Sequence, residues 1–123
     1  MARILLLEDN HDLQGVLRQV VELAGHKVLT GRSGVEGLTI LEQESEPFDV
    51  VICDLAMPEM DGVTFLQHLR GDPRWSSIYF VAMSGNEHDR VPAFEAGANE
   101  YLGKPFSIHD LNAMLAQYLS SRS

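Results

Sequence analysis

Short apolar runs alternate with amphipathic segments along the whole chain, and this alternation most constrains the fold. The apolar runs predict five strands, at 3–7, 26–30, 48–53, 78–83 and 100–102. The segment after each run repeats its apolar residues at helical spacing and predicts a helix. Strands that alternate with helices pair in parallel through right-handed crossovers, so the pattern predicts one doubly wound α/β sheet of five strands and five helices.

The length and charge narrow the class of protein. A chain of 123 residues has the size of one domain, and we expect it to span 1–119, followed by a polar tail over 120–123. Acidic residues outnumber basic ones by 18 to 9, and the sequence shows no basic patch, so we expect no direct contact with nucleic acid. No apolar run approaches the ~20 residues of a membrane helix and no secretory signal pattern is present, so we expect a cytoplasmic protein without membrane contact.

Charged and hydroxyl side chains follow the predicted strands at their C-terminal ends. Glu8 and Asp9 follow the first strand, and Asp54, Ser84 and Lys104 stand at the ends of the third, fourth and fifth. Ligands of open α/β sheets bind outside these strand ends, so we expect the side chains to converge. Clustered carboxylates repel one another, and Mg²⁺ relieves that repulsion. The set predicts transfer of a phosphoryl group to Asp54, with Mg²⁺ and Lys104 neutralising charge and Ser84 donating a hydroxyl.

The same residues also have structural interpretations. Glu8 and Asp9 alone could cap the first helix, Lys104 alone could be a solvated loop residue, and Asp61 is interpreted as the N-cap of the third helix. The one cysteine, Cys53, excludes an internal disulfide and is expected to be a core thiol. The joint placement of the carboxylates and the lysine at strand ends favours the functional interpretation.

Four segments resemble the response-regulator receiver domains of two-component phosphorelay systems. The segments are Leu5–Asn10, Asp54–Gly62, Met83–Gly85 and Phe94–Phe106. The resemblance covers the whole chain. It implies the flavodoxin-like architecture of that family and a cis peptide bond between Lys104 and Pro105.

The resemblance also implies a role for each site residue. Asp54 is implied as the phosphoacceptor, and Lys104 as the residue that pairs with Asp54 and then with the phosphoryl group. The implied ligands of Mg²⁺ are Glu8, Asp9, Asp54 and the backbone carbonyl of Ala56. Ser84 and Tyr101 are implied as the switch pair, in which Ser84 bonds a phosphoryl oxygen and Tyr101 rotates inward.

The partners implied by the resemblance are a phosphohistidine donor and an output partner. The donor is a histidine kinase or a histidine phosphotransfer protein, docked on the first helix and on the loop after Lys104, including Phe106. The output surface, which is also a candidate homodimer surface, comprises the fourth helix, the fifth strand and the fifth helix. The output partner is either a separate downstream protein or a fused domain.

Two alternatives to the phosphorylated switch remain open. One is a receiver-like interaction module that is not phosphorylated in the cell. The other is a small phosphatase with an aspartyl-phosphate intermediate, but such enzymes often carry an acidic group two residues after the nucleophile, where this chain has Ala56. We therefore expect no enzyme in the usual sense, only a chain that catalyses its own phosphorylation and autodephosphorylation.

Overall fold

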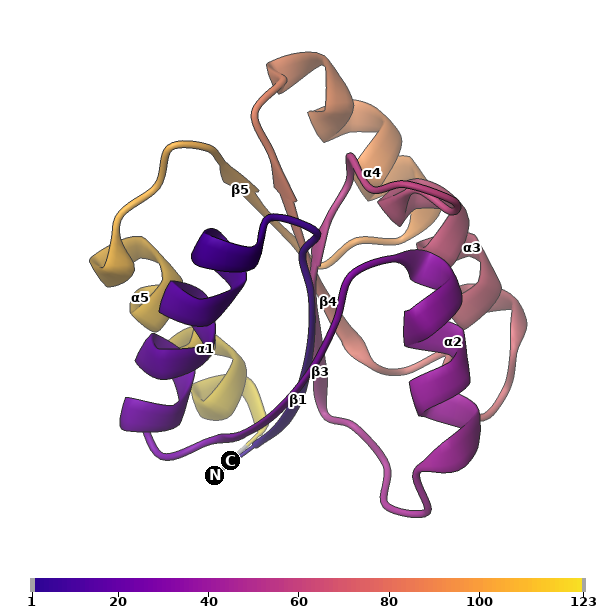
Figure 1. The fold of residues 1–123 in the computed structure, drawn as a ribbon, viewed down its shortest axis with the longest axis horizontal. Coiled ribbons are helices and arrows are strands. Elements are labelled where there is room, and N and C mark those ends of the chain that lie inside the picture. The colour runs from indigo at the N-terminus through magenta and orange to yellow at the C-terminus, as the bar shows by residue number, and fades with distance from the viewer. Residues whose placement is uncertain (1, 123) are drawn as a thin grey trace.

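A single parallel sheet runs through the middle of the molecule, with helices on both faces (Figure 1). The computed structural model describes residues 2–122. The strands are β1 (Arg3–Leu7), β2 (Lys27–Gly31), β3 (Val50–Asp54), β4 (Tyr79–Ser84) and β5 (Glu100–Gly103). They pair in parallel in the order β2-β1-β3-β4-β5, which confirms the predicted doubly wound α/β fold.

The helices divide between the two faces of the sheet. They are α1 (His11–Leu23), α2 (Gly34–Gln43), α3 (Gly62–Gly71), α4 (Arg90–Ala96) and α5 (Ile108–Arg122), with a 3₁₀ turn η1 (Glu87–Asp89) before α4. In Figure 1, α1 and α5 cover one face, and α2, α3 and α4 cover the other. Helix α5 extends into the segment 120–123 that the sequence predicted as a polar tail, and Ser123 lies outside the described residues. Among residues 2–122, no helix is long and apolar enough to cross a membrane.

The side chains of the central strands alternate between two cores. Leu5 and Leu7 of β1 pack in the core beneath α2 and α3, whereas Ile4 and Leu6 pack in the core beneath α1 and α5. All four side chains are fully buried. Strands covered on both faces need continuous apolar sequence, which explains the uninterrupted runs of β1 and β3.

The polypeptide reverses its winding direction between β1 and β3. The connection after β1 enters α1 on one face, and the connection after β3 enters α3 on the other (Figure 1). Such a reversal leaves a crevice beyond the carboxyl ends of the two strands. Gly62 permits a close approach there, since a Cβ at this position would lie 2.7 Å from the backbone oxygen of Asp54. Asp61 caps α3 by accepting the Thr64 N–H at 2.8 Å, which confirms its structural interpretation.

Helix α4 is short and contains Pro92. Pro92 lies in its first turn, where a missing N–H costs no helical hydrogen bond. Gly97 ends the helix in the left-handed region, with φ of 110°. Arg70 links α3 to the segments before β4 and after α4. Its guanidinium donates to the carbonyl oxygens of Ile78 and Gly97 and to the side chain of Asn99.

Candidate functional site

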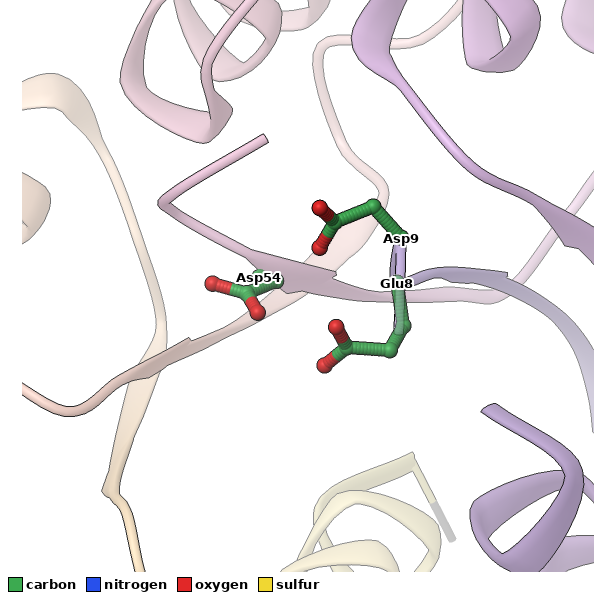
Figure 2. A group of neighbouring side chains, drawn as sticks. All are labelled: Glu8, Asp9 and Asp54. Atoms are coloured by element: carbon green, nitrogen blue, oxygen red, sulfur yellow. The ribbon is translucent and has the colours of Figure 1, made fainter. Parts of the chain in front are cut away.

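Three carboxylates meet in the crevice at the carboxyl edge of the sheet. Glu8 and Asp9 follow β1, Asp54 ends β3, and in Figure 2 the carboxylates of Glu8 and Asp9 both lie toward Asp54. One oxygen of each residue lies within 4.8 Å of the others. The convergence predicted from the strand ends is therefore confirmed. An all-oxygen donor set of this kind fits Mg²⁺, which binds carboxylates and keeps several waters.

The start of α1 does not use the two acidic residues after β1 as caps, so both can join this cluster. Asn10 is the N-cap, and its side chain accepts the Leu13 N–H at 3.0 Å. The interpretation of Glu8 and Asp9 as caps is therefore wrong, because the residue that follows them has a side chain of the right length and position for the cap. The Asn10 backbone N–H also donates to Glu8 Oε2 at 3.1 Å, which fixes the buried Glu8 carboxylate.

Lys104 is the cation of the site. Its Nζ lies 2.5 Å from Asp54 Oδ2 and 2.9 Å from Glu8 Oε1, so one ammonium bridges two buried carboxylates. Burial alone would lower the pKa of Lys104, but its hydrogen bonds to Asp54 and Glu8 and the attraction of their negative charges together raise that pKa. Burial raises the pKa of Glu8, and the hydrogen bond from Lys104 opposes this rise. The Lys104–Pro105 peptide bond is cis, as the resemblance implies.

The Asp54 carboxylate is held at both of its oxygens. Oδ2 accepts from Lys104, and Oδ1 accepts the backbone N–H of Ala56 at 2.9 Å. This bond orients the start of the loop after β3. The role of the Ala56 carbonyl as a metal ligand stays a prediction. The neighbouring Cys53 is a core thiol, as expected, and its pKa is raised by burial and by the Asp54 carboxylate.

Ser84 ends β4 and Tyr101 lies in β5, and the side chains of both contact the segment after β4. The Ser84 hydroxyl is 2.6 Å from Asp89 Oδ2, and the Tyr101 hydroxyl donates to the carbonyl oxygen of Asn86 at 2.8 Å. The side chain of Tyr101 is buried, and its bond to Asn86 holds the ring in this position. The inward rotation of Tyr101 on phosphorylation stays a prediction.

Three residues that shape the site were missed from the sequence. Asn10 could have been found, since an asparagine directly before a helical pattern is a strong N-cap signal. Gln14 donates from its amide to the carbonyl oxygens of Glu8 and Gly31, both at 3.0 Å, and a glutamine on a helix gives no sequence signal for such a bridge. Asp89 was missed because it resembles any acidic residue at a helix start.

Comparisons with known proteins agree with this geometry. The family model for the response regulator receiver domain matches residues 4–116. The KDP operon transcriptional regulatory protein KdpE of Escherichia coli (strain K12) is 34% identical over 125 residues, which cover 100% of this chain and 53% of KdpE. The chain spans about half the length of the curated relatives it matches.

Solved structures share the fold over almost the whole chain. A response regulator receiver domain protein from Clostridium thermocellum superposes with a TM-score of 0.89 at 27% identity, covering 99% of this chain and 97% of that one. The receiver domain of the sensor histidine kinase PA1611 from Pseudomonas aeruginosa PAO1 has a TM-score of 0.87 at 26% identity, covers 97% of this chain and 98% of that one, and has a magnesium ion coordinated in its active site cleft. The sheet order, the acidic crevice and the family match over 4–116 lead to one conclusion: this chain belongs to the response regulator receiver domain family of two-component signalling.

Proposed function

We propose that this receiver domain is a phosphorylation-dependent switch that accepts a phosphoryl group on Asp54. The proposed donor is the phosphohistidine of a histidine kinase or of a histidine phosphotransfer protein. The observation that carries the proposal is the 2.5 Å pairing of Asp54 with Lys104 in a crevice shared with Glu8 and Asp9. Phosphoryl transfer depends mainly on positioning and on charge neutralisation, and this arrangement supplies both to a carboxylate nucleophile.

The transfer exchanges one bond to phosphorus for another. An oxygen of Asp54 forms a bond to phosphorus, the bond between phosphorus and the donor imidazole breaks, and its electron pair stays on the imidazole nitrogen. The residues that would hold Mg²⁺ are Glu8, Asp9, Asp54 and the backbone carbonyl of Ala56. When bound, Mg²⁺ supplies positive charge at the phosphoryl oxygens. Lys104 exchanges its bond to the Asp54 carboxylate for one to a phosphoryl oxygen and keeps Glu8 as its second partner.

The change of surface is proposed to begin at Ser84, whose hydroxyl donates to a phosphoryl oxygen. Ser84 and Tyr101 are linked through Asn86, since the Asn86 N–H donates to Ser84 Oγ and the Asn86 carbonyl accepts from Tyr101. The Arg90 guanidinium carbon lies 5.3 Å from the centroid of the Tyr101 ring, on the face formed by α4, β5 and α5. We propose this face as the output surface, toward a downstream protein or a fused domain, and as a homodimer surface.

The proposed docking surface of the donor lies on the other side of the crevice. It is a groove of about 400 Å³ lined by Leu13, Val16, Leu17, Lys104, Pro105, Phe106 and Ile108. Val16 and Ile108 are about half exposed, so the groove presents apolar side chains to a partner. Because Lys104 lines both the groove and the acidic site, a helix docked there brings its histidine toward Asp54.

The lifetime of the phosphorylated state depends on groups that can activate water for hydrolysis of the aspartyl phosphate. The relevant positions are two residues after Asp54 and two after Ser84, occupied by Ala56 and Asn86. Alanine cannot orient or deprotonate water, and asparagine is a poor base. We therefore propose slow to moderate autodephosphorylation and no turnover of external phosphate esters.

Phosphorylation by a small-molecule donor tests the proposal directly. The chain is incubated with acetyl phosphate and Mg²⁺, and its intact mass is followed for the wild type, for Asp54→Asn and for the matched control Asp61→Asn. We expect a gain of one phosphoryl group in the wild type and the control, dependent on Mg²⁺, and none in Asp54→Asn. No gain in the wild type would favour the unphosphorylated interaction module, and release of phosphate from monoesters would favour the phosphatase.

A further inference from the structure

The hydroxyl of Ser84 is engaged by a carboxylate outside the acidic crevice. Ser84 Oγ lies 2.6 Å from Asp89 Oδ2 and 3.2 Å from the carbonyl oxygen of Asn86. A serine hydroxyl has one proton to donate, and an ionised carboxylate at the shorter distance is the stronger acceptor. The Asn86 N–H in turn donates to Ser84 Oγ at 3.0 Å, which fixes the oxygen from the other side.

Asp89 is not required as a helix cap. It is the last residue of η1, and α4 follows without a break, so its backbone is already helical. Asn86 caps this helical segment, because its side chain accepts the His88 N–H at 3.0 Å. The Asp89 side chain makes no capping bond, and its carboxylate instead contacts Ser84 at the end of β4.

We propose that Asp89 is a positioning residue that withholds the Ser84 hydroxyl from a phosphoryl group on Asp54. The proposal rests on the function proposed above, in which the same hydroxyl donates to a phosphoryl oxygen. One proton cannot serve both acceptors, so the loaded site must break the bond between Ser84 and Asp89. Breaking this hydrogen bond therefore costs free energy that weakens the interaction of Ser84 with a phosphoryl group.

Release of Asp89 also connects the crevice to the output surface. Asp89 is followed directly by Arg90, whose guanidinium carbon lies 5.3 Å from the Tyr101 ring centroid. The hydroxyl of Tyr101 is bound to Asn86, in the same short segment. When Ser84 turns to a phosphoryl oxygen, the freed start of α4 changes its position against Tyr101.

Titration with beryllofluoride in the presence of Mg²⁺ tests this cost, because beryllofluoride stands in for the phosphoryl group on Asp54. Binding is followed by the NMR signal of the Gly85 amide in the wild type, Asp89→Ala and Glu87→Ala. The Glu87 variant removes the same charge from the same segment, and Glu87 is bonded to Arg90 and not to Ser84. We expect Asp89→Ala to bind about ten-fold more tightly, equivalent to about 1.4 kcal/mol, and Glu87→Ala to change by less than about two-fold.

A double-mutant cycle distinguishes an effect on the Ser84 hydroxyl from a general effect of the Asp89 charge on beryllofluoride binding. In a Ser84→Ala background, Asp89→Ala should give no further gain, since no hydroxyl remains to be released. Equal gains with and without Ser84, equal gains for the Asp89 and Glu87 variants, or no gain for Asp89→Ala would each overturn the proposal. Asp89→Asn, which keeps the shape of the side chain, should fall between the wild type and Asp89→Ala. If the wild type itself binds no beryllofluoride, the proposed function fails instead.

Discussion

Replacement of Lys104 by alanine isolates the electrostatics of the acidic site. The change removes the only ammonium within hydrogen-bond distance of Asp54 and Glu8 in the described residues 2–122, and leaves their buried carboxylates side by side. Removal of one partner from a buried ion pair costs about 3–5 kcal/mol. Lys104 is 24% exposed, and Glu8 can take up a proton because burial already raises its pKa. We therefore expect a loss at the lower end, about 3 kcal/mol of unfolding free energy.

Magnesium should restore much of this loss. Without the competing ammonium, the carboxylates bind Mg²⁺ as tightly as in the wild type or more tightly, and a ligand at ~100 times its Kd stabilises the folded chain by about 2.7 kcal/mol. The assay is urea unfolding followed by circular dichroism, with and without Mg²⁺. Lys27→Ala is the matched control, because Lys27 is the other lysine of the chain and is exposed. A Lys104→Ala protein as stable as the wild type without Mg²⁺, or less stabilised by Mg²⁺ than the wild type, would refute this account.

Three other perturbations test separate parts of the structure. Asp9→Ala should weaken Mg²⁺ binding at least about ten-fold without loss of stability, because Asp9 is exposed; calorimetric titration checks this, and unchanged affinity would remove Asp9 from the site. Arg70→Ala should destabilise the fold by about 2–4 kcal/mol in urea unfolding, because the carbonyl oxygen of Gly97 and its neighbours lose their hydrogen-bond donor. The control Arg18→Ala, on the exposed face of α1, should change stability by less than about 0.5 kcal/mol. Burial lowers the pKa of His26, whose Nδ1 accepts the Ala2 N–H at 2.9 Å. The contribution of neutral His26 to the free energy of unfolding is therefore full above about pH 6.5 and declines as the pH falls through the lowered pKa. His26→Gln should abolish this part of the pH dependence of unfolding.

The sheet and the acidic crevice follow from local sequence patterns. Apolar runs such as Val50–Cys53 specify buried parallel strands, and parallel strands present their carboxyl ends at one edge, so Asp54 and Glu8 are expected at the same edge of the sheet. Their close approach also requires that β1 and β3 are neighbours, which the strand order provides. The N-cap roles of Ser33 and Asp61 were also predictable, since capping depends on the next few residues of the chain. The predicted strand and helix ends differ from the observed ones by a few residues, as at β3.

The choice of partner by a polar side chain was not predictable in the same way. Ser84 has several acceptors within reach once the fold is formed, and its bond to Asp89 depends on the orientation of η1 and α4. The buried ring of Tyr101 depends likewise on the carbonyl of Asn86 and on Arg90. Tertiary placement at the level of an ångström decides these contacts, and a one-dimensional pattern does not contain it.

The ion pair between Lys104 and Glu8 joins positions 96 residues apart in a chain of 123. A nascent chain that has been synthesised only through β4 already contains Glu8, Asp9 and Asp54 but no Lys104. Such a chain has carboxylates that repel one another and no cation to orient the nucleophile. Under the proposed function, Lys104 can therefore assist phosphoryl transfer to Asp54 only after β5 has joined the sheet.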